Sequence, residues 1–199
     1  MFQLNNKIAI VTGGGSGIGK EVCKVLAKQG AHVIVVDLNA DSAKGTVDKI
    51  TANGNTSEAL TLDVTNQGAV TTAFEKLKSL DILVNCAGIS HIGSATTTNE
   101  ADFEKVFQVN VKGVYNCLQA GVNVMKKSGG GSIVNISSIA AKVGLSDRFA
   151  YSMSKGAVHA MTMSVAKDYI KDNIRCNSVS PGRVHTPFVD GFLKKNYPG

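Results

Sequence analysis

The sequence predicts an α/β fold, a doubly wound and mostly parallel sheet with helices on both of its faces. Short runs rich in Val and Ile alternate along the chain with longer helical stretches. The runs are apolar at nearly every position, as in residues 8–11, and the first of them leads directly into a glycine-rich turn. This alternation is typical of strand–helix–strand units, and strands without polar positions are typical of a parallel sheet buried on both sides.

Six strands are expected in order along the chain. Each is a short apolar run that ends at a turn or a polar residue, at 7–12, 32–37, 58–63, 81–85, 132–137 and 175–180. Three consecutive glycines at 129–131 form the turn before the fifth strand. Strands in this order, with helices between them, predict a Rossmann-type sheet.

Five helices are expected between the strands, at 18–29, 41–52, 67–77, 100–125 and 151–169. After the sixth strand the chain contains one helix-like segment, at 188–195, and no further strand. Either the fold ends there or the sequence is shorter than the gene product.

Length and composition restrict the class of protein. A chain of 199 residues, with 43% hydrophobic and 18% charged residues, predicts one well-packed domain over 1–199. No apolar run approaches the ~20 residues that span a bilayer, and the N-terminus lacks the pattern of a signal peptide, so we expect a cytoplasmic protein without a membrane partner. The net charge of +6 comes from dispersed basic residues, which argues against a nucleic-acid partner. The four cysteines and four histidines are scattered, so we expect reduced thiols and no metal site.

The glycine-rich turn predicts a site for a dinucleotide phosphate. Gly13, Gly17 and Gly19 form a G-x-x-x-G-x-G pattern between the first strand and a helix, with Ser16 and Ile18 inside it. Glycines let backbone amides approach a diphosphate, and the helix N-terminus adds partial positive charge. The alternative for such a turn is a purely structural role.

Acidic residues at the ends of the next two strands extend this prediction. Asp37 can accept hydrogen bonds from both ribose hydroxyls and would repel a 2′-phosphate, and neither Ser16 nor Leu38 supplies a compensating positive charge. The sequence therefore favours NAD over NADP, although Asp37 could also cap the strand end. Asp63, followed by Val64, could receive the adenine amino group, or could serve as a helix cap or turn residue.

Tyr151 and Lys155 are four residues apart on one expected helix, so both side chains can point into one site. A nearby cation favours the phenolate of a tyrosine, which otherwise keeps its proton until about pH 10. The pair is thus a candidate for proton transfer. Taken alone, such a pair is more often a helix-surface pair.

Together these motifs, with Asn85-Cys86-Ala87-Gly88, Ser138 and Pro181-Gly182, resemble those of the short-chain dehydrogenase/reductase family. The resemblance covers residues 7 to about 186. It implies hydride transfer between a dinucleotide and a carbinol carbon without a metal, in a homodimer or homotetramer. It also implies that the chain continues through a substrate lid, beginning at 186–199, into a final strand that this sequence lacks.

The resemblance assigns catalytic roles to four residues. Tyr151 would exchange the hydroxyl proton, Lys155 would lower the pKa of that phenol and bind the nicotinamide ribose, and Ser138 would hydrogen-bond the substrate oxygen. Ser137 competes with Ser138, but the family spacing to the tyrosine favours Ser138. Asn110 would help to hold a water that relays protons from Lys155, and its alternative is a polar residue at a helix kink or face.

The resemblance also extends the cofactor site. Asn85, Ala87 and Gly88 would pack against the cofactor, with Cys86 replacing a second asparagine of the family motif. The segment after the sixth strand would contribute further contacts, those of Val184 and Thr186 being to the nicotinamide carboxamide. These residues are Pro181, Gly182, Val184 and Thr186.

Arg148, three residues before Tyr151, suggests the substrate. A guanidinium can bind a carboxylate with two hydrogen bonds, so a hydroxy or keto acid is expected, unless Arg148 forms an ordinary salt bridge with Asp147 or Asp168. Residues 147–155 resemble a subgroup of the family that oxidises hydroxybutyrate and deoxy sugar acids. In that subgroup a histidine at the place of His91 also approaches the substrate, whereas His91 by itself is more often a loop residue.

Two other functions stay open at this stage. One is a reductase of 3-oxoacyl thioesters or of carbonyl compounds in general, which shares the catalytic residues and often uses NADP. The other is a dinucleotide-binding sensor without catalysis, which the presence of Ser138, Tyr151 and Lys155 disfavours.

Overall fold

Six parallel strands form a single sheet in the computed structural model, which describes residues 3–186. Their spatial order is β3-β2-β1-β4-β5-β6, so the chain winds outward from β1 to one side and then from β4 to the other. The strands are β1 (Ile8–Thr12), β2 (His32–Asp37), β3 (Ser57–Thr61), β4 (Ile82–Asn85), β5 (Gly131–Ile136) and β6 (Ile174–Val179). The predicted doubly wound α/β fold is confirmed.

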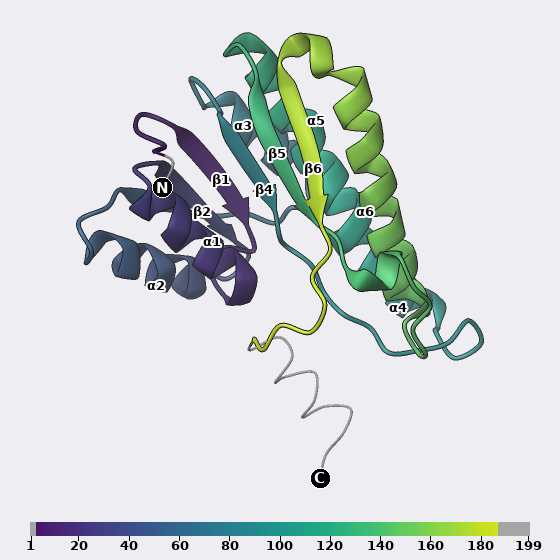
Figure 1. The fold of residues 1–199 in the computed structure, drawn as a ribbon. Helices are drawn as coiled ribbons and strands as arrows, with labels where there is room; N and C mark the ends of the chain where they lie inside the picture. Colours follow the sequence, from purple (N-terminus) through teal and green to yellow (C-terminus); the bar gives the residue numbers. More distant parts are fainter. Residues whose placement is uncertain (1–2, 187–199) are drawn as a thin grey trace.

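Helices lie on both faces of the sheet, with α1 and α2 on one side and α3, α5 and α6 on the other (Figure 1). The bounds are α1 (Gly17–Lys28), α2 (Ala40–Thr51), α3 (Gln67–Glu75), α4 (Glu100–Phe107), α5 (Gly113–Lys127) and α6 (Phe149–Asp168). In three of them an asparagine precedes the helix and accepts a hydrogen bond from the amide three residues on, which explains the starting points. These caps are Asn39, Asn66 and Asn99.

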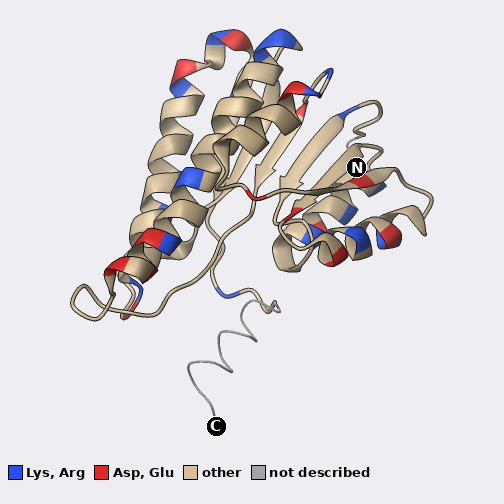
Figure 2. Ribbon diagram, turned by 180° about the vertical axis from the view of Figure 1, so that it is seen from behind, with Lys and Arg blue, Asp and Glu red and all other residues tan. Residues whose placement is uncertain are grey.

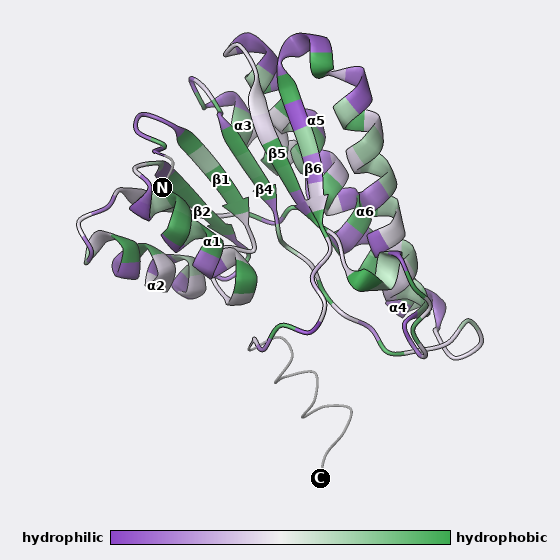
Figure 3. Ribbon diagram, viewed as in Figure 1, coloured by the Kyte–Doolittle hydropathy of each residue, from purple (hydrophilic) through white to green (hydrophobic). Residues whose placement is uncertain are grey.

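Alternate side chains of the strands pack into two separate hydrophobic clusters, one on each face of the sheet. Val11 packs with Cys23 and Ala27 of α1, whereas its neighbour Ile10 packs with Phe74 of α3 on the opposite face. Successive side chains of a strand point to opposite faces, so a strand covered on both sides must be apolar at every position. The strands β1 and β4 are accordingly green along most of their length in Figure 3.

The helix expected over 100–125 differs from the prediction. It divides into α4 and α5, joined by a π-helical turn at Gln108–Lys112. A π-helical turn inserts one extra residue and so re-aims the side chains within it. Asn110 lies in this turn and is fully buried, which fits the alternative of a polar residue at a helix kink.

The remaining differences concern boundaries. The third strand ends at Thr61, two residues before Asp63, and α6 begins at Phe149 instead of residue 151. The expected lid segment lies outside the described residues except for Thr186. Within 3–186, no helix combines the length and the apolar character that crossing a bilayer requires. Charged residues lie mostly on the helices and are dispersed in both signs (Figure 2).

A chain of hydrogen bonds crosses the apolar interior beneath the site. Asn85 Nδ2 donates to Asn135 Oδ1 at 2.8 Å, and Asn135 Nδ2 donates to the Thr162 hydroxyl at 2.9 Å. All three side chains are at most 4% exposed. Because buried polar groups are costly without partners, Asn135 fixes β4, β5 and α6 relative to one another.

Asn135→Ala should therefore destabilise the protein by about 1–3 kcal/mol, since it leaves the Asn85 amide buried without an acceptor. Denaturant unfolding measures the change in the free energy of unfolding. Asn53→Ala, at an exposed position, is the control and should have a much smaller effect. An equal loss in the two variants would contradict a special role for the buried amide chain.

Candidate active site

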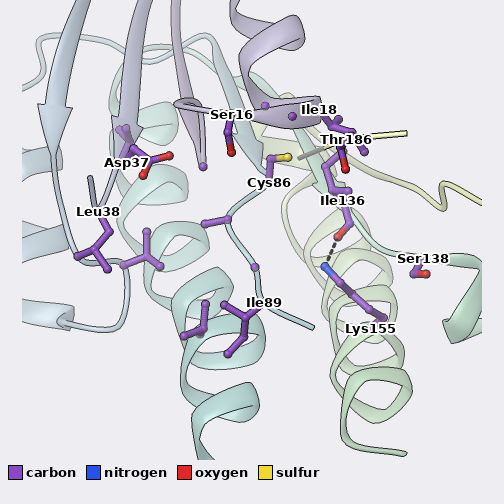
Figure 4. A pocket seen from close by; sticks show the side chains of 18 of the residues that line it. Ser16, Ile18, Asp37, Leu38, Cys86, Ile89, Ile136, Ser138, Lys155 and Thr186 are labelled. Carbon is purple, nitrogen blue, oxygen red and sulfur yellow. Dashed lines mark hydrogen bonds between the residues drawn. The ribbon is translucent and has the colours of Figure 1, made fainter. Parts of the chain in front are cut away.

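A cleft of about 500 Å³ lies at the carboxyl ends of the strands, next to the point where the sheet order reverses between β1 and β4. Segments that are far apart in the sequence meet there. Asp37 and Leu38 lie at one end of the cleft, and Ser138 and Lys155 lie at the other (Figure 4). The cleft is therefore elongated, with a carboxylate at one end and hydroxyl and ammonium groups at the other.

The glycine-rich turn forms one wall through close backbone contacts. Gly13 has a positive φ of 65°, and a Cβ there would lie 2.9 Å from the Cα of Ala87. Thr12 Oγ1 accepts hydrogen bonds from the amides of Cys86 at 3.1 Å and Ala87 at 3.2 Å, which join the end of β1 to the loop after β4. Only glycine fits this conformation and this contact, so the turn is a cradle that side chains do not fill.

Asp37 presents hydrogen-bond acceptors at one end of the cleft. Its two carboxylate oxygens each accept a backbone amide at 3.0 Å, from Gly15 and Asn39, and the residue also lines the cleft. Because each oxygen can accept more than one hydrogen bond, the carboxylate is oriented by the backbone and keeps capacity for a hydroxyl pair. The turn role and the binding role of Asp37 are thus compatible.

Asp63 also combines two roles. Its Oδ1 accepts hydrogen bonds from the amide and the hydroxyl of Thr65, both at 2.8 Å, as expected of a turn residue. Asp63 and Val64 nevertheless line the cleft. Neither of the two alternatives from the sequence is excluded.

Tyr151 and Lys155 both line the other end of the cleft, on α6. Lys155 is only 6% exposed, and its Nζ donates to the Ile136 carbonyl at 2.9 Å (Figure 4) and lies 5.8 Å from the centre of the Tyr151 ring. A buried ammonium facing a phenol is not a helix-surface pair. The structure therefore removes the alternative that the sequence left open.

The choice between the two serines follows from their hydrogen bonds. Ser137 is buried, and its hydroxyl donates to the Lys155 carbonyl at 3.0 Å. The single hydrogen of this hydroxyl is therefore used in holding α6. Ser138 Oγ accepts the amide of Ala140 at 3.1 Å, and Ser138 lines the cleft with Tyr151 and helps to lower the pKa of its phenol. Ser138 is thus the serine whose hydroxyl acts on the candidate proton-transfer residue.

Burial controls the ionisation of the pair. It lowers the pKa of Lys155 to about 8, an effect that the nearby thiol of Cys86 partly offsets. Burial also raises the pKa of Tyr151, while the hydrogen bond from Ser138 and the positive charge of Arg148 lower it in part. The Lys155 ammonium donates to the Ile136 carbonyl, and the effect expected of it on the pKa of the phenol stays a prediction.

Asn110 anchors the loop after β4. Its Oδ1 accepts the Ile89 amide at 2.8 Å, and its Nδ2 donates to the Ile89 carbonyl at 2.9 Å and to Ser154 Oγ at 3.0 Å. Asn110 itself does not line the cleft, but Ile89 does. Both hydrogens of the amide are used within the protein, and the proposed water-holding role stays a prediction.

The structure brings together nearly all the predicted cofactor residues. Asn85 is the exception, because its amide points to Asn135 in the core. The predicted residues that line the cleft are Gly13, Ser16, Gly17, Ile18, Gly19, Asp37, Asp63, Val64, Ala87, Gly88, Tyr151, Lys155, Pro181, Gly182, Val184 and Thr186.

The two predicted substrate residues Arg148 and His91 do not line this cleft. Arg148 directly precedes α6, its Nη1 donates to the Asp147 carbonyl at 3.0 Å, and its charge helps to lower the pKa of the Tyr151 phenol. His91 Nε2 lies 3.5 Å from Asp102 Oδ2, and its side chain is 14% exposed. His91 thus faces α4, in agreement with the alternative of a loop histidine.

Sequence reasoning missed several apolar residues of the cleft, among them Ile89, Val109 and Ile136. Ile89 and Ile136 had a usable signal, because each stands at or just after the carboxyl end of a parallel strand. Val109 had none, since it comes from the π-helical turn. Within 3–186, no three His, Cys, Asp or Glu residues cluster as metal ligands would.

Comparison with known proteins identifies relatives along almost the whole chain. A family profile described as short chain dehydrogenase matches residues 7–196. A cyclopentanol dehydrogenase from Comamonas sp. (strain NCIMB 9872) is 39% identical over 197 residues, which cover 97% of this chain and 79% of the relative. A 2-keto-3-deoxy-L-fuconate dehydrogenase from Xanthomonas campestris pv. campestris is 34% identical over 186 residues, covering 93% and 61%.

A solved structure of similar fold carries ligands. It is a 7α-hydroxysteroid dehydrogenase complexed with NADH and 7-oxo glycochenodeoxycholic acid, 35% identical, with a TM-score of 0.90. The match covers 95% of this chain and 75% of that one. The chain thus spans roughly three quarters of the length of several relatives: 79% of the cyclopentanol dehydrogenase, and 71% and 73% of two others.

Lys155→Met should stabilise the protein at pH 7 by about 2 kcal/mol, because the buried ammonium disfavours folding by more than its hydrogen bond returns. The folded pKa of about 8 lies below the unfolded value of 10.5, so the unfolded state binds the extra proton between them and the stability of the parent protein rises with pH through that window. The difference between the two proteins should therefore shrink from pH 8 to pH 10.5.

Denaturant unfolding at pH 7 and pH 10 measures this difference. Lys28→Met, at an exposed position of α1, is the control and should show no such pH dependence. A stability difference for Lys155→Met that is the same at both pH values would refute the effect of burial on the lysine.

Proposed function

The chain belongs to the short-chain dehydrogenase family, and on that basis we propose that it oxidises a secondary alcohol with NAD, in a reversible hydride transfer, on a hydroxy acid or sugar acid. As a member it is an oxidoreductase acting on CH–OH groups. The observation that carries the proposal is the convergence of Ser138, Tyr151 and Lys155 at one end of the cleft, opposite Asp37. A homodimer or homotetramer is part of the same proposal.

Tyr151, Ser138 and Lys155 have different roles at the reacting oxygen. NAD, when bound, supplies the hydride acceptor. In oxidation Tyr151 acts as a phenolate and takes the proton from the substrate hydroxyl, while Ser138 donates a hydrogen bond to the substrate oxygen. Lys155, whose pKa of about 8 lies near the working pH, holds the nicotinamide ribose and can pass the proton onward. Ser138 and Lys155 are buried and Tyr151 is half-buried, so all three groups meet the substrate at the inner wall of the cleft.

NAD rather than NADP is supported by the charge at the other end of the cleft. Asp37 is fixed by two backbone amides, so it cannot easily turn away from a 2′-phosphate. The adjacent residue that lines the cleft, Leu38, is apolar and 70% exposed, and offers no positive charge. The glycine cradle fits the diphosphate between the two ends.

An acidic substrate is supported by Arg148. Its guanidinium acts on the Tyr151 phenol, so a carboxylate bound to it would lie near the reacting oxygen. One similar protein is named for an acid, 2-keto-3-deoxy-L-fuconate, and the similar solved structure is complexed with another, 7-oxo glycochenodeoxycholic acid. The cyclopentanol of a third has no carboxylate. Arg148 is the feature of this chain that favours the acids.

A substrate panel tests the proposed function. Hydroxy acids, sugar acids and cyclic alcohols are each assayed with NAD and NADP, and we expect NADH formation with at least one acid. Tyr151→Phe should lower kcat at least about a hundredfold, because it removes the proton acceptor. A strong preference for NADP would favour the carbonyl reductase instead, and dinucleotide binding without turnover on the panel would favour the sensor.

Arg148→Ala should raise KM for an acidic substrate by about tenfold or more, since a charged hydrogen-bonded pair is lost, while KM for a neutral cyclic alcohol changes little. Its charge also acts on Tyr151, but that effect reaches kcat for both substrates alike. Arg175→Ala, at the far end of β6, is the control. Equal increases in KM for both substrates would contradict the proposal that Arg148 binds the substrate carboxylate.

A further inference from the structure

Ser154 lies between the two candidate catalytic residues of α6 and is itself fully buried. Its hydroxyl donates to the Tyr151 carbonyl at 2.7 Å and accepts a hydrogen bond from Asn110 Nδ2 at 3.0 Å. The serine is therefore the bridge between the helix that carries Tyr151 and the π-helical turn that carries Asn110.

The hydrogen bonds around this bridge are complete. A primary amide has two hydrogens to donate, and those of Asn110 go to Ser154 and to the Ile89 carbonyl. Asn110 Oδ1 accepts the Ile89 amide, and the single hydrogen of Ser154 goes to Tyr151. A buried network in which every donor is used has one preferred arrangement, because any shift leaves a polar group unpaired.

The network lies close against the cleft on both sides. A Cβ on Gly88 would lie 3.2 Å from Asn110 Oδ1 and 3.5 Å from Lys155 Nζ, so the loop after β4 fits between the π-helical turn and the lysine. Ser137 holds the same turn of α6 from the opposite side, through the Lys155 carbonyl. A displacement of α6 would therefore change the distance of the Tyr151 phenol from Ser138.

We propose that Ser154 is a positioning residue of the dehydrogenase reaction: its hydroxyl fixes α6 against the π-helical turn and so sets the place of the Tyr151 phenol beside Ser138. Ser154 touches neither the cleft nor the reacting groups. It acts through the backbone of Tyr151 and the side chain of Asn110. This role rests on the proposed function for its catalytic meaning, but its effect on the phenol is a property of the protein alone.

The phenol can be observed directly, because the protein has four tyrosines and no tryptophan. The ultraviolet absorbance change on ionisation, measured with and without Tyr151→Phe, isolates the titration of Tyr151. In Ser154→Ala we expect this pKa to rise, since the hydrogen bond from Ser138 and the charge of Arg148 both lower it in the parent protein and both depend on the place of the phenol. The titration is confined to the pH range in which circular dichroism finds each variant folded.

Kinetics provide the second readout. Ser154→Ala should lower kcat about tenfold, as expected when one hydrogen bond that holds a reacting group is lost. The dissociation constant of NADH should stay within about twofold, because Ile89 keeps both of its bonds to Asn110. Ser154→Thr keeps the hydroxyl and should titrate and turn over as the parent protein does.

Ser164→Ala, at an exposed position of the same helix, is the matched control and should change neither readout. A Ser154→Ala protein that loses thermal stability but keeps the Tyr151 titration of the parent would overturn the proposal. So would a Ser154→Thr protein that titrates as the alanine variant does. If the substrate panel gives no turnover, the proposed function fails, while the titration still decides the positioning role of Ser154.

Discussion

The cleft depends on a close contact between two stretches of backbone, the turn after β1 and the loop after β4. The Thr12 hydroxyl accepts the amides of Cys86 and Ala87, and Gly13 leaves no room for a side chain between the two segments. This contact keeps adjacent strand ends together at the point where the sheet order reverses. The contact positions the glycine-rich turn that can hold a diphosphate. It also positions the start of the loop that runs from β4 to Ile89.

The second requirement is the fixed placement of α6. Three polar contacts hold the turn that contains Tyr151 and Lys155: Ser137 to the Lys155 carbonyl, Ser154 to the Tyr151 carbonyl, and Lys155 Nζ to the Ile136 carbonyl. They bury an ammonium whose pKa is lowered to about 8, which disfavours folding at neutral pH. The proposed proton transfer needs a group that titrates near neutrality, and the burial that lowers stability here also brings the pKa of Lys155 into that range.

Much of the fold was predictable because its signals are local. Apolar runs fixed the six strands, and the glycine pattern fixed the turn after β1 without reference to any other element. The helix expected over 100–125 was predicted as continuous because the extra residue of a π-helical turn leaves no mark in a helical pattern. The two hydrogen bonds that Asn110 of this turn makes with Ile89, one accepted from its amide and one donated to its carbonyl, join residues far apart in the sequence.

By itself the sequence determined the family, the position of each motif at a strand end, and the carboxylate of Asp37 after the second strand, since each is a matter of residue type and local spacing. The tertiary structure decided that the Ser137 hydroxyl is bonded to α6, that Lys155 is buried, and that Asn85 belongs to the core. These outcomes depend on distances between separate elements and on burial. Only the packed chain sets either quantity.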